Sequence, residues 1–129
     1  VASILWGETW RMPASAEFET MKKVTYWKWD DTDKGYYVFV PQAGDEGKEN
    51  GENSNTYDNS AALLFFPATG YGYRNEFNGV GSFGYYWSSS LYLSDRNDAY
   101  YLLFREGLAV NTQAHSSRYS GRSVRPVSD

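Results

Sequence analysis

The side chains best able to do covalent or acid–base chemistry are few in this 129-residue chain. Its single histidine, His115, would have to serve any Ser-His-Asp arrangement. The serine run 88–90 lacks the Gly-x-Ser-x-Gly context of a nucleophile elbow. The 16 acidic residues show no spacing that singles out a pair for glycoside hydrolysis, and there is no cysteine. We therefore predict no catalytic residues and a protein that is not an enzyme.

A metal site is the next possibility, and it could lie only in the acidic segment 42–60. Gly, Asn, Asp, Glu and Ser dominate this segment, and such a composition buries too little apolar surface to offset the entropy of ordering. We predict a flexible polar loop here, no metal ligands and no cofactor. Calcium is the one alternative, although the spacing fits no EF-hand loop. Its candidate ligands are Asp45, Glu46, Glu49, Glu52 and Asp58.

The last third of the chain instead has the composition of a recognition surface. Aromatic and apolar anchors recur in 84–90, 99–104 and 118–127, and the residues between them share no chemical theme. Tyr and Arg are enriched where proteins contact ligands, because they supply large, rigid or multidentate contacts. We predict that the outward-facing residues between the anchors bind a ligand. These are Tyr92, Leu93, Arg96, Asp98, Tyr101, Leu103, Arg105, Ala109, Asn111, His115, Ser116, Tyr119 and Arg122.

Short strands must position these residues. In 99–104 the alternation of side chains places Phe104 on the core face, which leaves Tyr101 and Leu103 on the opposite, exposed face. A turn at 105–107 and a returning strand at 108–112 complete a hairpin. The same alternation predicts that Leu108 and Val110 point inward and that Ala109 and Asn111 point outward, with a loop at 113–117 and a closing strand at 123–127.

The rest of the chain predicts one short helix and further strands, so the fold class is α+β. A helix over 15–23 would carry Ser15 as its nearest cap, with Phe18 at the position where a glutamate would complete a capping box. The pattern also predicts a hairpin from 25–29 and 35–40, a strand buried on both faces within 61–68, and aromatic-pinned irregular structure over 70–84. We expect Arg118 and Arg125 to be scaffold residues whose side chains bond to backbone or carboxylate.

Five ordered motifs carry a family resemblance that spans nearly the whole chain. They are Trp10-Arg11-Met12-Pro13 with Glu17-Phe18, the run 64–71, the run 84–90, Ala99-Tyr100-Tyr101 with Phe104, and Arg118 with Gly121 and 123–127. In these motifs the chain resembles the FISUMP (major paralogous domain) family of gut and rumen bacteria. That resemblance implies a C-type-lectin-like fold made of short antiparallel strands, one or two helices and much irregular loop.

The resemblance also implies a function. Some members of the family are variable proteins of diversity-generating retroelements, in which randomised template adenines diversify a C-terminal binding surface. Randomising both adenines of an Asn codon that ends in a pyrimidine cannot yield Lys, Met, Trp, Glu or Gln. Residues 88–129 contain no Lys, Met or Trp, and the two exceptions, Glu106 and Gln113, must then be fixed positions. We therefore expect a non-catalytic module that recognises a protein or cell-surface ligand. A glycan-binding or adhesin-type module, or a structural subunit of a surface assembly, is the alternative; the calcium-binding motifs of sugar-binding relatives are absent.

Composition excludes other classes of partner. The formal net charge of −4 disfavours a general nucleic-acid binder. No apolar run approaches the roughly 20 residues that span a bilayer, so we expect no direct membrane insertion. We expect residues 1–129 to form a single domain, the C-terminal module of a longer protein. The resemblance implies an extracellular or cell-surface location on a bacterium, with the signal or anchor outside this chain.

Overall fold

The computed structural model describes residues 9–47 and 56–128, and their fold is α+β with many short antiparallel strands. This part of the chain contains one α-helix, one 3-10 helix and four small sheets, ordered β1-β11, β2-β3-β4, β7-β8-β9 and β10-β5-β6. The α+β prediction is confirmed. The elements are β1 (Trp10–Arg11), α2 (Ser15–Val24), β2 (Tyr26–Asp30), β3 (Gly35–Phe39), η2 (Asn59–Ala61), β4 (Leu64–Pro67), β5 (Tyr71–Tyr73), β6 (Glu76–Asn78), β7 (Phe83–Leu91), β8 (Asp98–Arg105), β9 (Asn111–Ser117), β10 (Gly121–Arg122) and β11 (Val127–Ser128).

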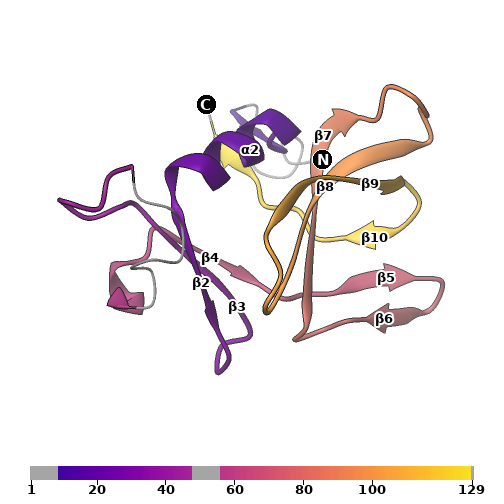
Figure 1. Ribbon diagram of the computed structural model, residues 1–129. Coiled ribbons are helices and arrows are strands. Elements are labelled where there is room, and N and C mark those ends of the chain that lie inside the picture. The colour runs from indigo at the N-terminus through magenta and orange to yellow at the C-terminus, as the bar shows by residue number, and fades with distance from the viewer. Residues whose placement is uncertain (1–8, 48–55, 129) are drawn as a thin grey trace.

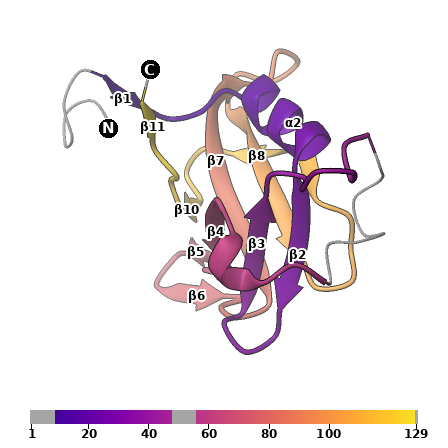
Figure 2. The ribbon, with the colours of Figure 1, turned by 90° about the vertical axis from the view of Figure 1, so that its left-hand side faces the viewer.

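Two three-stranded sheets and the helix enclose the core. Figure 1 shows β2, β3 and β4 on one side of the molecule, β7, β8 and β9 on the other, and α2 above them. Trp27 of β2 stacks on Phe66 of β4 with ring centroids 5.3 Å apart, and Tyr36 meets Phe104 of β8 edge-on at 5.2 Å. Leu102 and Phe104 are almost fully buried in this cluster. Figure 2, turned by 90°, shows the same arrangement from the side of β2 and β3.

The helix α2 starts where predicted but is capped differently. Ser15 is its first residue, and Ala14 occupies the N-cap position. Glu17 therefore stands at the third helical position, where its carboxylate accepts a hydrogen bond from the Ala14 N–H at 2.7 Å. The same carboxylate receives two hydrogen bonds from Arg11 at 2.7 Å each, which fasten β1 to the helix. The prediction that Phe18 leaves the capping box unfilled is wrong, because the cap is Ala14, one residue before Ser15.

A close approach between β7 and β8 fixes the second sheet. Gly84 pairs with Phe104 across the two strands, and the Phe104 ring lies directly over the glycine. A Cβ at Gly84 would stand 2.0 Å from the Phe104 ring, so only glycine fits. Because side chains alternate along a strand, this contact sends Tyr85 and Trp87 to the face of β7 opposite Phe104.

The serine run 88–90 ties the end of β7 to its neighbours. The Ser88 hydroxyl donates to the Tyr100 carbonyl at 2.9 Å, and the Ser90 hydroxyl accepts from the Ser15 N–H at 3.0 Å. The β7–β8 register shifts here, so that four steps along β7, from Trp87 to Leu91, match two along β8. The hydroxyls of Ser88 and Ser90 therefore bond to backbone groups of neighbouring elements.

The structure corrects several predicted elements of the C-terminal half. The returning strand β9 spans Asn111–Ser117 and not 108–112, so the predicted loop 113–117 is strand. Val110 is buried as predicted, but Leu108 is 52% exposed. The predicted strand 123–127 is replaced by an isolated bridge at Ser123 and by β11, which pairs with β1. The strand β9 starts late because the connection after β8 runs over 106–110, and a bulge between Tyr101 and Leu103 shifts the β8–β9 register further.

Other corrections concern 61–84. The strand β4 lies at the edge of its sheet, and only Phe66 within it is fully buried, so burial on both faces is wrong. The segment 70–84 contains the hairpin β5–β6. Phe77 in that hairpin is 84% exposed, so it does not pin the segment to the core.

The described ends of the acidic segment 42–60 are held by one tyrosine. Tyr57 is buried against Tyr26 and Phe39, and its hydroxyl donates to Asp45 at 2.7 Å. Residues 48–55, with Glu49 and Glu52, lie outside the described residues. Asp58 accepts from the Ser60 N–H, and Glu46 accepts from the Gly44 N–H. No group of three or more His, Asp or Glu within the described residues could hold a metal ion.

Within the described ranges, no helix has the length and apolar character needed to cross a membrane.

Gly84→Ala should destabilise the protein strongly, because the added methyl group collides with the buried Phe104 ring. Overpacking of this kind costs about 1–3 kcal/mol of the free energy of unfolding. Gly72→Ala is the matched control, since the nearest atom to its added Cβ is 3.7 Å away. Urea denaturation of both variants measures the difference; equal stabilities would contradict the close packing of β7 on β8.

Glu17→Gln should change how stability depends on acid. The hydrogen bonds from Arg11, followed by that from Ala14, lower the pKa of Glu17 from 4.5 to about 2. A carboxylate whose folded pKa is depressed stabilises the fold above its unfolded pKa and loses that contribution as the pH falls through the folded value. The stability gap between wild type and Glu17→Gln should therefore be full at neutral pH and close between about 4.5 and about 2. Thermal melts across this pH range measure it, with Glu76→Gln on β6 as the exposed control; a pH-independent gap would contradict the account.

Candidate functional site

The predicted site residues do not form one continuous surface. Tyr101 and Arg122 meet on the face of β8 away from the core, whereas Tyr92, Asp98 and His115 meet on the other side of the strand. The split follows from the alternation along β8, because Tyr100 and Tyr101 are consecutive and point in opposite directions.

The first group is a cage of aromatic rings around Arg122, which we name the arginine cage. The guanidinium carbon of Arg122 lies 3.8 Å from the ring centroid of Tyr101, 4.8 Å from Tyr85 and 4.9 Å from Trp87. The ring of Tyr71, from β5, is 5.8 Å away. Cation–π attraction and close packing hold the side chain at this position.

Backbone pairing brings Arg122 to this face. Ser123, the next residue, bridges to Tyr86 at the free edge of β7, where its N–H donates to the Tyr85 carbonyl at 3.1 Å. The Trp87 N–H donates back to the Ser123 carbonyl at 3.0 Å. Figure 1 shows β10 lying alongside β5 of the β5–β6 hairpin, with which it pairs. Arg122 is therefore fixed by main-chain contacts on one side and by rings on the other.

Part of the Arg122 guanidinium lacks hydrogen-bond partners among the described residues. Its Nε and Nη1 atoms are buried and have no partner among the described residues. Burial lowers the pKa of Arg122 below its ordinary value, because the aromatic surroundings remove water from the charge. Burial likewise raises the pKa of Tyr85. Since buried polar groups are nearly always paired, two unpaired donors on one side chain are unusual.

A shallow hollow adjoins the cage. It has a volume of about 280 Å³ and is lined by Arg122, by Tyr71 and by the backbone of Gly70, Gly72 and Gly121. The exposed ring of Phe77 stands at its edge. The absence of side chains on three lining residues leaves the main chain accessible there. The hollow therefore offers hydrogen-bonding groups beside an aromatic surface.

The second group is the histidine cluster of Tyr92, Asp98, Tyr100 and His115. The rings of Tyr92 and His115 stack with centroids 3.7 Å apart and an angle of 5°. The Nδ1 atom of His115 lies 3.1 Å from an Asp98 carboxylate oxygen. Tyr100 meets both rings edge-on. This cluster holds the loop 92–97 against the β8–β9 hairpin.

Asp98 and His115 are arranged like two members of a catalytic triad, but no nucleophile accompanies them within the described residues. Asp98 stands where it could orient the imidazole, yet within the described residues no hydroxyl is hydrogen-bonded to the second ring nitrogen of His115. A serine nucleophile needs that contact in order to be activated. The arrangement fits an exposed contact residue that is stiffened by stacking.

Most of the remaining predicted residues are exposed at the two ends of the β8–β9 hairpin. Leu93 is 93% exposed and Tyr119 is 78% exposed. They lie in the segments 92–97 and 118–120, which are joined by a hydrogen bond from the Arg118 N–H to the Asn97 carbonyl at 2.9 Å. Arg96 is exposed in the same loop, whereas Ser116 is half-buried opposite Ala99 on β8. Exposed at the other end are Arg105, Ala109 and Asn111, with the half-buried Leu103 paired to Asn111.

Two expectations about this surface need correction. Tyr101 is half-buried beneath Arg122 and is not freely exposed. Arg118, expected to be a bonded scaffold residue, is exposed, and no side-chain hydrogen bond is found for it in 9–47 and 56–128. Sequence reasoning also missed the roles of Tyr71 and Tyr85. The signal for Tyr85 was available, since Phe83, Tyr85 and Trp87 share one face by their period-two spacing.

Arg122→Ala should lower the free energy of unfolding by about 1–3 kcal/mol, because it removes the side chain that covers three rings. Arg122→Met should cost less, since it keeps most of the apolar stem and removes the unpaired donors. The exposed Arg118→Ala should change stability by less than about 0.5 kcal/mol. Chemical denaturation of the three variants measures this order; a neutral Arg122→Ala would contradict the cage.

Comparison with known families matches residues 10–127 to a family described as "Domain of unknown function (DUF8237)". No curated protein and no solved structure matches the chain. The family match covers both the arginine cage and the histidine cluster, and it extends from β1 to the first residue of β11. The chain therefore belongs to the family described as domain of unknown function DUF8237.

Proposed function

We propose that this domain is a non-catalytic binding module that recognises a protein or cell-surface ligand through its C-terminal third. The observation that carries the proposal is Arg122, whose Nε and Nη1 atoms are buried without a partner in the described part of the chain. A buried donor left unpaired costs about 1–3 kcal/mol. A ligand oxygen that reached these atoms would recover that cost on binding.

The surroundings of Arg122 suit recognition more than chemistry. Its guanidinium is held in place by Tyr85, Trp87 and Tyr101, so little side-chain entropy is lost when a ligand binds. The planar group presents donors in a fixed fork, which favours a carboxylate, a phosphate or a backbone carbonyl. The aromatic rings beside it supply apolar contact area.

Exposed residues on the loops at one end of the β8–β9 hairpin supply a second, adjustable set of contacts. Leu93, Arg96 and Tyr119 extend from the 92–97 and 118–120 segments, where nothing in the core restricts their identity. Diversification by a retroelement would act at such positions without cost to the fold. In this proposal Arg122 is a fixed hydrogen-bond donor, and the exposed loop residues are the variable contacts. An adjacent near-copy of the coding DNA that differs at adenines would support this origin.

We extend the proposal to fold and location. The one α-helix of residues 9–47 and 56–128, the short antiparallel strands and the pairing of β1 with β11 support a C-type-lectin-like arrangement. The resemblance to secreted and surface-anchored proteins supports an extracellular or cell-surface location on a bacterium.

The test is an array of extracellular protein domains and glycans probed with multimers of the wild-type domain. We expect saturable binding to at least one protein, and Arg122→Met should weaken it about tenfold or more, because charge-assisted hydrogen bonds are worth about 1.5–3 kcal/mol. The triple variant Leu93→Ser, Arg96→Ser, Tyr119→Ser should weaken it without lowering the melting temperature.

Two matched controls accompany the array. Arg118→Met removes an exposed arginine of the same end of the hairpin, and Lys23→Ser, Val24→Ser, Leu63→Ser removes exposed residues on the far side. Both should bind as wild type does. Full binding by Arg122→Met would contradict the role of Arg122. A signal restricted to glycans and abolished by a calcium chelator would favour the glycan-binding alternative.

A further inference from the structure

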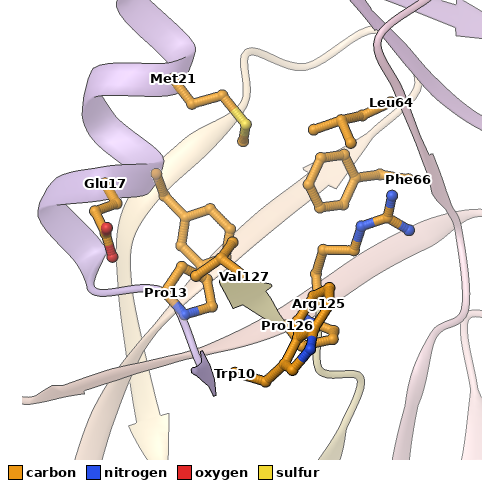
Figure 3. Close-up of a pocket in the computed structure, with 10 residues that line it drawn as sticks. Trp10, Pro13, Glu17, Met21, Leu64, Phe66, Arg125, Pro126 and Val127 are labelled. Atoms are coloured by element: carbon orange, nitrogen blue, oxygen red, sulfur yellow. The ribbon is translucent and has the colours of Figure 1, made fainter. Parts of the chain in front are cut away.

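A separate pocket lies on the helix side of the molecule, away from the arginine cage. It has a volume of about 520 Å³, which is within the range of small-molecule sites. Figure 3 shows that α2 forms one wall and that Leu64 and Phe66 of β4 form the other. The lining is mostly apolar; its residues are Trp10, Pro13, Phe18, Met21, Leu64, Phe66, Pro126 and Val127, together with the charged Glu17 and Arg125.

The negative charge in this pocket is already paired. Glu17 accepts two hydrogen bonds from Arg11 and one from the Ala14 N–H, all at 2.7 Å. These bonds occupy both of its oxygens and hold its pKa at about 2, so the group stays ionised and bound to its partners at neutral pH. Glu17 therefore contributes little free charge to the pocket.

The positive charge of the pocket has no paired carboxylate among the described residues. Arg125 lies with its guanidinium carbon 5.7 Å from the ring centroid of Phe66, and Figure 3 shows it across the pocket from Glu17. The structure gives it no hydrogen bond or ion pair with any residue in 9–47 or 56–128. This contradicts the expectation that Arg125 would be bonded to backbone or carboxylate. An arginine that lies over a ring in an apolar pocket can donate hydrogen bonds to an acceptor on a ligand.

We propose that this pocket binds a small apolar monocarboxylate, with the carboxylate on Arg125 and the hydrocarbon body between α2 and β4. The pocket carries one unpaired positive charge, and a single carboxylate complements it with a bidentate geometry that guanidinium favours. Met21 gives the wall a flexible, polarisable surface that adapts to the shape of an apolar group. This site is independent of the surface proposed for the module's recognition function.

Octanoate is the probe, and the methionine methyl groups report where it binds. The chain has two methionines, of which Met21 lines this pocket and Met12 does not. In a titration of methyl-labelled protein, the Met21 signal should shift saturably with octanoate while the Met12 signal stays in place. Octylamine and 1-octanol share the hydrocarbon body but lack the carboxylate. Their affinity should be lower than that of octanoate by about tenfold or more.

Variants of Arg125 test the charge. Arg125→Gln should weaken octanoate binding about tenfold or more, and Arg125→Lys should restore part of it. Arg105→Gln is the matched control, because Arg105 lies over the Phe83 ring at 5.6 Å in the same manner but outside the pocket. It should bind octanoate as the wild type does. The melting temperature of each variant confirms that it is folded.

Several results would overturn the proposal. Equal binding of octanoate, octanol and octylamine would show an apolar hollow with no preference for a carboxylate. Unchanged binding by a folded Arg125→Gln would remove Arg125 from the site. A Met21 shift that follows protein concentration in the absence of octanoate would identify a second copy of the chain as the occupant. Absence of any shift would show that the pocket does not accept the probe.

Discussion

The packing of the Phe104 ring on Gly84 is the constraint on which the described structure depends. It fixes the register of β7 on β8, and the alternation along these strands then decides which side chains face the core. Leu102 and Phe104 join the buried cluster, while Tyr85, Trp87 and Tyr101 are sent to the opposite face. A shift of one residue would exchange the two sets and dismantle both the core and the arginine cage.

The arginine cage shows how the same constraint shapes the candidate site. The strand register fixes the rings of Tyr85, Trp87 and Tyr101. Packing against these rings therefore holds the Arg122 guanidinium in place. Its Nε and Nη1 atoms keep no partner among the described residues, and the exposed loops 92–97 and 118–120 are free to differ. The helix-side pocket is similar in one respect. Arg11 pairs with Glu17 there, and Arg125 has no ion pair with any of the described residues. The arginine cage and the helix-side pocket thus each contain one arginine, Arg122 and Arg125, beside aromatic rings.

Local pattern was enough to predict the helix, the β2–β3 hairpin and the inward placement of Phe104. It failed where long-range pairing decides the outcome. The strand β9 begins only at Asn111, because the connection over 106–110 is longer than the predicted turn. A bulge opposite Leu102 then shifts its register further, and no local signal marks that bulge. Arg122 looked like a free contact residue because its neighbours in sequence are polar. Its ring partners come from β5, β7 and β8, which only the folded chain brings together.

The most direct test of the arginine cage is the NMR signal of the Arg122 Nε–H group. The account predicts an upfield ring-current shift and slow exchange with water, because the atom is buried beside aromatic rings and has no protein acceptor among the described residues. The Nε–H signals of the exposed Arg96 and Arg118 serve as references within the same spectrum. An Arg122 signal that coincides with theirs and exchanges as fast would contradict the central claim.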